Sequence, residues 1–224
     1  DERRFSDLRG MTLNNAIADP SYLRQCVGYD LFAKAGVVAP RCNFATVRVN
    51  GELLGLYVHL ENLDKPFLKE HFADNDGNLY EGAISDFRDG WDATFQKKTN
   101  KSDPDRSDIA ALVAALETDD AGLVAALEPL IDLDGFLTFW AMESLLMHID
   151  GYGGNTNNFY MYADPDTGRF HFIPWGIDMI LFDYPQQDGT PKIVFAEGVL
   201  TRRLYQLPET QNRFFARQRE LLGA

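Results

Sequence analysis

The sequence has little that suits a membrane or a nucleic acid. It contains no run of about 18 apolar residues, so no segment is long enough to span a bilayer as a helix. Basic residues are scarce, because 21 Lys and Arg stand against 34 Asp and Glu, for a net charge of −13 at pH 7. Nucleic acids and anionic membranes attract basic surfaces, so we expect neither as a partner. The charge is that of a solvated acidic surface, compatible with divalent cations or basic partners.

Cysteine is scarce as well. Cys26 and Cys42 are the two cysteines, too few for a structural zinc site with its four ligands. Two buried free thiols are the ordinary interpretation of such a pair. A disulfide is the alternative and would favour an exported protein. Because a short connection through Gly36 folds the following strand back beside the first helix, we expect the two cysteines to come close.

The remaining composition is that of one large globular domain. Of the 224 residues, 45% are hydrophobic, and the aromatic residues include 16 Phe, nine Tyr and three Trp. Such a chain can bury a sizeable core. The first residue is Asp rather than Met and no signal peptide is present, so we expect a piece of a longer protein. Its compartment cannot be read from these first residues.

Turn and cap residues predict helices and hairpins along the chain. Asp19 and Pro20 are typical of a helix start, and Gly36 is typical of a helix end. Asn50-Gly51 between two β-rich runs predicts a hairpin over residues 44–60. A second hairpin is expected over residues 159–173. In the first helix, Leu23, Val27 and Leu31 are predicted to form an apolar stripe. Further helices are expected over residues 65–72, 109–116, 132–149 and from 209 onward. A long surface loop is expected over residues 84–106.

The segment from residue 132 to residue 178 carries the candidate chemistry. A long apolar helix ends at His148-Ile149-Asp150, an Asn- and Gly-rich loop follows, and a hairpin separates Asn158 from Asp178. Protein kinases place a catalytic Asp, a metal-binding Asn and a metal-binding Asp in this order. Phosphoryl transfer needs a carboxylate that receives the proton of the substrate hydroxyl, and Mg²⁺ needs hard oxygen ligands. The two ends of one hairpin can reach the same ions.

Each of these residues also has a structural interpretation. Asp150, Asn155 and Asn158 are common turn formers, Asp178 could cap a helix, and His148 could be a packing residue. Their joint occurrence around a hairpin of suitable size favours the catalytic interpretation.

Several further motifs stand in order along nearly the whole chain. They are Leu13-Asn14-Asn15, Asp19-Pro-Ser-Tyr-Leu-Arg24, Ala39-Pro-Arg41, Val49-Asn50-Gly51-Glu52, Gly55-Leu-Tyr57, Glu61, Asp150 to Tyr162, Phe172-Ile-Pro-Trp175 and Asp178. With these motifs the chain resembles the CotH kinase family. Members are typically exported or surface proteins; characterised ones resemble secretory-pathway kinases that phosphorylate coat proteins on Ser, and some fungal relatives are host-binding surface proteins.

The resemblance implies an α+β, protein-kinase-like fold. Residues 1–63 would complete a small, β-containing lobe and residues 64–224 would form a mainly helical large lobe, with ATP and Mg²⁺ or Mn²⁺ between them. The intact protein would phosphorylate Ser or Thr of a secreted, surface or coat protein, outside the cell or at its surface.

The resemblance also assigns roles to single residues. Asp150 would be the catalytic base, and Asp178 a metal ligand. Asn158, immediately before the strand, would be the metal-binding Asn. Asn155 is its competitor, because it stands five positions after Asp150, which is the usual kinase spacing. Glu61 matches a family position at the end of the second strand and is assigned to cofactor binding, although its chemistry alone gives it no role.

The chain also departs from the family pattern. Gly176 stands where many members carry the first Asp of Asp-x-Asp, which puts binding of two metals in doubt, and Gln25 stands where an acidic residue is common. The Lys expected on the ATP phosphates would precede residue 1. Two rivals follow: a pseudokinase used as surface adhesin or coat scaffold, since fold does not imply function, and an acidic Ca²⁺-binding surface domain.

Overall fold

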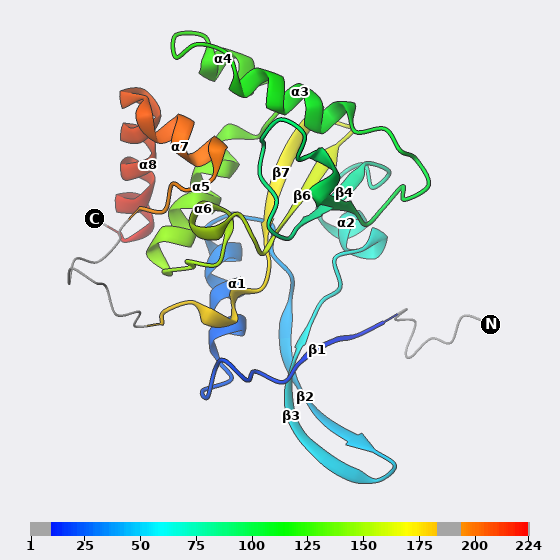
Figure 1. Cartoon of the computed structure of the whole chain (residues 1–224). Helices are drawn as coiled ribbons and strands as arrows, with labels where there is room; N and C mark the ends of the chain where they lie inside the picture. Colours follow the sequence, from blue (N-terminus) through cyan, green and yellow to red (C-terminus); the bar gives the residue numbers. More distant parts are fainter. Residues whose placement is uncertain (1–9, 183–193, 224) are drawn as a thin grey trace.

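Two antiparallel sheets and the helices around them form the chain (Figure 1). The computed structural model describes residues 10–182 and 194–223. The first sheet has the order β1-β3-β2 and the second the order β5-β4-β6-β7. The mixed α and β composition expected from the sequence is therefore confirmed. The strands are β1 (Thr12–Asn14), β2 (Cys42–Val49), β3 (Glu52–Leu60), β4 (Asn78–Gly82), β5 (Phe95–Lys97), β6 (Phe159–Asp164) and β7 (Arg169–Pro174).

Within the described residues there are eight α-helices and two short 3₁₀ turns. Helix α1 lies beside the first sheet, while the other helices lie around the second sheet (Figure 1). The helices are α1 (Arg24–Lys34), α2 (Lys65–His71), α3 (Ser107–Leu116), α4 (Leu123–Leu127), α5 (Leu133–Leu145), α6 (Tyr152–Asn155), α7 (Val199–Gln206) and α8 (Pro208–Leu221), and the 3₁₀ turns are η1 (Asp92–Thr94) and η2 (Ile177–Met179).

The hairpin of β2 and β3 confirms the turn predicted at Asn50-Gly51. Asn50 and Gly51 have φ angles of 51° and 87°, which are the positive values that a two-residue hairpin turn requires. The strands pair from Cys42 opposite Leu60 to Val49 opposite Glu52. The hairpin projects away from the body of the molecule (Figure 1).

Helix α1 begins later than predicted and buries a different face. Its first residue is Arg24, whose backbone N–H is capped at 2.8 Å by the carboxylate of Asp19. The predicted stripe is wrong, since Leu23 is 53% exposed and Val27 43% exposed. The helix instead buries Tyr29 and Phe32, and the Phe32 ring lies 6.0 Å from that of Phe139 in α5. Aromatic residues bury more area than Val or Leu, so they decide which face turns inward.

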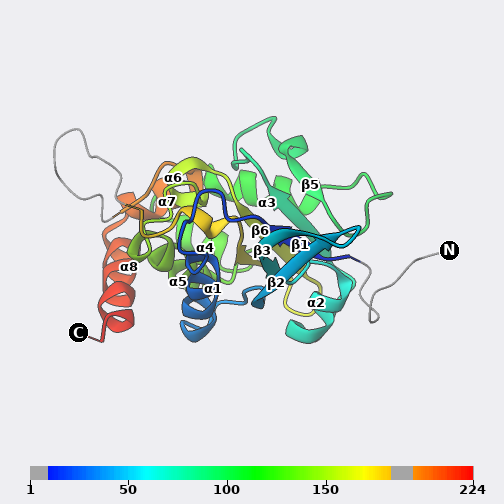
Figure 2. The ribbon, with the colours of Figure 1, turned by 90° about the horizontal axis from the view of Figure 1, so that it is seen from below.

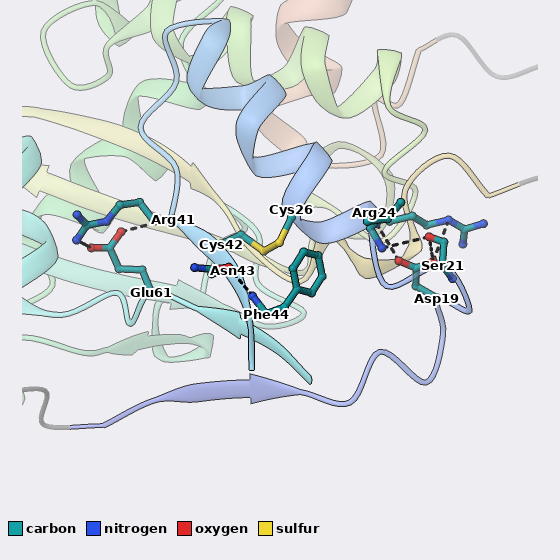
Figure 3. Close-up of a disulfide and its surroundings, with 10 residues drawn as sticks. Asp19, Ser21, Arg24, Cys26, Arg41, Cys42, Asn43, Phe44 and Glu61 are labelled. Atoms are coloured by element: carbon teal, nitrogen blue, oxygen red, sulfur yellow. Dashed lines mark hydrogen bonds and ion pairs between the residues drawn. A yellow bond between two sulfur atoms is a disulfide. The ribbon is translucent and has the colours of Figure 1, made fainter. Parts of the chain in front are cut away.

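A disulfide between Cys26 and Cys42 joins α1 to β2 (Figure 3). The Cα atoms are 5.0 Å apart, within the range that a disulfide needs. The expected closeness of the two cysteines is confirmed, and the interpretation as free thiols is wrong. The physical reason is the short connection from α1 to β2, which brings Cys42 back beside the helix.

Helix α5 lies at the centre of the helices around the second sheet. The Asp132 carboxylate caps its first turn by accepting the N–H of Gly135. The helix ends at Leu145, four residues before the predicted end, and the chain then turns toward Asp150. Rings from the helix pack on the β6–β7 hairpin, with Phe136 4.6 Å from Phe172. Figure 2 shows α1 and α8 beside α5.

The expected surface loop over 84–106 is only partly a loop. Phe87 and Phe95 are 2% and 0% exposed, and Phe95 begins the edge strand β5. The two rings stack with centroids 5.2 Å apart. The sequence predicted a surface loop here because most residues around these two phenylalanines are polar.

Candidate active site

Asp150 lies in a tight loop between α5 and β6. The turn α6 and two residues with positive φ, Thr156 at 51° and Asn158 at 50°, fold this loop back on itself. The carbonyl of Gly151 accepts the backbone N–H of Asn155 at 2.9 Å and that of Asn157 at 3.3 Å. The loop thereby turns several polar side chains toward one carboxylate.

Three asparagine side chains donate to the carboxylate of Asp150. Asn155 Nδ2 donates to Oδ1 at 2.7 Å, and Asn158 Nδ2 donates to Oδ2 at 2.6 Å. Asn157 Nδ2 lies 3.3 and 3.4 Å from the two oxygens. The structure therefore brings both predicted metal-binding Asn residues to Asp150.

Asp178 lies in η2, directly after the hairpin. Helix α1 holds this turn in place, because a Cβ on Gly28 would lie 2.5 Å from Ile180 Cδ1 and 2.6 Å from Ile177 Cδ1. Burial raises the pKa of Asp178, and the negative charges of Asp150 and Asp19 raise it further. A hydrogen bond from the Asn14 side chain opposes this shift of the pKa. Asp178 is thus a half-buried carboxylate near other acids.

The pairing of β6 with β7 brings the two ends of the hairpin together. Phe159 is paired with Pro174, and the N–H of Trp175 donates to the Asn158 carbonyl at 3.3 Å. Gly176 has a φ of 56°, and a Cβ there would lie 2.5 Å from Asn158 Oδ1. Asn158 fills the space that a side chain at 176 would need, which explains physically why this chain has glycine there.

Two cavities lie along the first sheet, and the smaller one borders this region. The smaller, of about 420 Å³, lies between the first sheet and the start of η2, lined among others by Asn14, Gln25, Leu60, Trp175 and Gly176. It adjoins the Asn158 side chain through Gly176.

The larger cavity, of about 910 Å³, is lined by α1, the disulfide, the end of β3 and α2. Glu61 lies on its wall, where its carboxylate accepts hydrogen bonds from the backbone N–H and the guanidinium of Arg41 (Figure 3). Glu61 is not among the residues that line the smaller cavity beside Gly176.

A buried acid and a buried base lie behind the Asp150 loop. Glu143 is 0% exposed and His148 is 1% exposed, with Nδ1 4.0 Å from Glu143 Oε1. Burial raises the pKa of Glu143 to about 8, although the N–H groups of Gly153 and Tyr152 donate to its carboxylate. Burial lowers the pKa of His148 to about 4, although the negative charge of Asp150 acts to raise it. His148 is thus an internal packing residue, as its structural interpretation had it.

Sequence reasoning missed several residues that meet here. Asn157 had no assigned role, and Asn14 and Asp19 were noted only as parts of motifs. Asp19 is 1% exposed and contributes to the electrostatics of Asp178. Burial raises the pKa of Asp19, but hydrogen bonds from Ser21 and Arg24 lower it more, so the pKa lies below its usual range. Two Asn-Asn pairs, at 14–15 and 157–158, were the available signal.

The donor set suits a hard divalent cation in part. Asp178 offers a carboxylate, and Asn158 retains Oδ1 because only its nitrogen is engaged with Asp150. Burial is the main cause of the raised pKa of Asp178, and the negative charges of Asp150 and Asp19, which add to it, are charges that a cation would offset. In the described part of the chain no three His, Cys, Asp or Glu side chains gather as a metal set. A cation here would depend on amide oxygens and water, as Mg²⁺ sites often do.

Comparison with known proteins places the chain in a family. A family model described as "CotH kinase protein" matches residues 1–224, the whole chain. The chain belongs to the CotH kinase protein family. The resemblance drawn from the sequence motifs is thereby confirmed.

Relatives of this CotH-family chain include bacterial and fungal proteins. It is 26% identical over 188 residues to "Inner spore coat protein H" of Bacillus subtilis, covering 79% of this chain and 51% of that protein. It is 24% identical over 223 residues to "Invasin CotH2" of Rhizopus delemar, covering 88% of this chain and 38% of that protein. The chain thus spans about half or less of these curated relatives. None of the helices in residues 10–182 and 194–223 is long and apolar enough to cross a membrane.

Proposed function

We propose that this chain carries the catalytic part of an ATP-dependent protein kinase. The observation that carries the proposal is the convergence of three Asn amides on the Asp150 carboxylate, in a loop whose Asn158 abuts Gly176 on the segment bearing Asp178. This is the order in which protein kinases place a base and metal ligands, and Asn158 links the Asp150 loop to the segment that carries Asp178. Membership of the CotH kinase family supports the same reaction.

Each predicted residue keeps a role in the proposal. Asp150 orients the acceptor hydroxyl and receives its proton late in the transfer. Asp178 and Asn158 hold Mg²⁺ or Mn²⁺, with Asn155 as the alternative amide; the bound ion supplies charge stabilisation for the ATP phosphates. Glu61 remains the proposed cofactor-binding residue, from its place at the end of β3.

The lobes and the nucleotide site are part of the proposal. Residues 10–63 would belong to the small lobe and residues from 64 onward to the large one. The 420 Å³ cavity between the first sheet and Trp175–Gly176 is the proposed entry for ATP, because it adjoins Asn158. Ser or Thr of a secreted, surface or coat protein would be the acceptor. The names of the spore coat and invasin relatives favour this location.

The test is phosphate transfer and nucleotide titration in the intact protein. We expect Asp150→Ala to abolish transfer while ATP affinity changes little, because it acts on the acceptor. Asp178→Asn should abolish metal-dependent nucleotide binding. Asp166→Ala, in the exposed turn at the far end of the same hairpin, is the matched control and should behave as wild type. Wild-type transfer by Asp150→Ala would end the kinase proposal.

One feature favours a second candidate, a scaffold or adhesin without turnover. The Asp150 carboxylate already accepts from three side-chain amides, and Gly176 supplies no second carboxylate to the metal. Metal-stimulated ATP binding in wild type, without any transfer, would support this candidate.

A further inference from the structure

Glu143 forms a buried connection between α5 and the loop that carries Asp150. It lies in the last turn of the helix and is 0% exposed. Its Oε1 accepts the backbone N–H of Tyr152 at 2.8 Å, and its Oε2 accepts that of Gly153 at 2.9 Å. One side chain thus satisfies two consecutive N–H groups at the start of α6, which have no partner within the helix.

The glycines of the loop allow this close approach. A Cβ on Gly151 would overlap Glu143 Oε1, and a Cβ on Gly153 would lie 3.1 Å from Oε2 and 2.8 Å from the carbonyl oxygen of Phe195. Side chains at either position would push the loop away from the helix. Glycine at positions 151 and 153 therefore leaves the space that the Glu143 side chain occupies.

The anchored backbone leads directly to the asparagine side chains. Gly151, next to Asp150, accepts the N–H groups of both Asn155 and Asn157, and Tyr152 accepts that of Thr156 at 3.1 Å. Release of Tyr152 and Gly153 from the helix would free this turn as a unit. The amides that converge on Asp150 would then lose their common orientation.

We propose that Glu143 is a positioning residue for the candidate active site. Its carboxylate fixes the 151–153 backbone on α5 and so sets the geometry of Asp150 and its asparagines. This rests on the proposed function in so far as Asp150 is catalytic. Glu143 itself would contact neither nucleotide nor acceptor. A carboxyl group can accept through both of its oxygens, ionised or protonated, whereas the NH₂ of an amide only donates and would face one of the two N–H groups.

The experiment compares Glu143→Gln with Asp132→Asn in the intact protein. Both replace a carboxylate by an amide on α5, at opposite ends of the helix. Hydrogen exchange should be at least tenfold faster at Tyr152 and Gly153 in Glu143→Gln and unchanged there in Asp132→Asn. Transfer by Glu143→Gln should show a kcat reduced tenfold or more, with a KM for ATP within threefold of wild type. Asp132→Asn should keep the wild-type kcat.

The outcomes separate this inference from the proposed function. Unchanged exchange at Tyr152 and Gly153 would overturn the positioning role, whatever the activity. Fast exchange with an unchanged kcat would also overturn it, since the loop geometry would then not matter to transfer. If wild type itself transfers no phosphate, the proposed function fails, and the exchange data alone decide whether Glu143 fixes the loop.

Discussion

Removal of the disulfide is expected to destabilise the fold strongly. The bond joins residues 16 apart in the sequence. A cross-link that closes a loop of about 15 residues restricts the unfolded chain by about 3 kcal/mol. Replacement of both cysteines by Ser keeps the side chains of similar size, so we expect the free energy of unfolding to fall by about 3 kcal/mol. A loss of this size is a large fraction of the stability of an ordinary domain.

The assay is reversible urea unfolding followed by tryptophan fluorescence. Oxidised wild type is compared with reduced wild type and with the Cys26→Ser/Cys42→Ser variant. The reduced protein and the double variant should agree with each other and lie well below the oxidised protein. Agreement of all three within about 0.5 kcal/mol would refute the reasoning, because the bond would then be absent or its loop already closed in the unfolded chain.

Three further predictions concern the interior of the protein. The pKa of Glu143 is raised from 4.5 to about 8, so its contribution to the free energy of unfolding is complete below pH 4.5 and is lost as pH rises from there through 8. The pKa of His148 is lowered to about 4, so its contribution is complete above pH 6.5 and is lost as pH falls through 4. The free energy of unfolding, measured by chemical denaturation, should therefore fall by about 2 kcal/mol from pH 6.5 to 8. The Glu143→Gln substitution should remove this fall. Gly176→Ala should cost about 1–2 kcal/mol from the positive φ and displace the Asn158 side chain, visible as a shift of its NMR amide signals. Phe32→Ala should cost about 3–5 kcal/mol in the same unfolding assay, since the ring is fully buried against α5.

Local patterns in the sequence were sufficient for several elements. Asn50-Gly51 predicted its hairpin because few residue pairs accept positive φ at both turn positions. The apolar stripe that follows Asp132 predicted α5, because residues at helical spacing form one face. The order of Asp150, Asn158 and Asp178 around a hairpin also followed from the chain itself, since the hairpin connects them covalently. These features depend on residues close in sequence.

Tertiary structure decided what depends on distant neighbours. Helical spacing cannot say which of two apolar faces turns inward, and α1 buried Tyr29 and Phe32 because α5 offers aromatic partners. The same holds for Glu143, which looks like an ordinary helix residue until the Asp150 loop folds over it. Gly176 looked like a lost ligand, and only the neighbouring Asn158 shows that a side chain there has no room. The physical reason is common to all three: burial, hydrogen bonding and steric exclusion are properties of a position among its neighbours, and the sequence alone does not specify those neighbours.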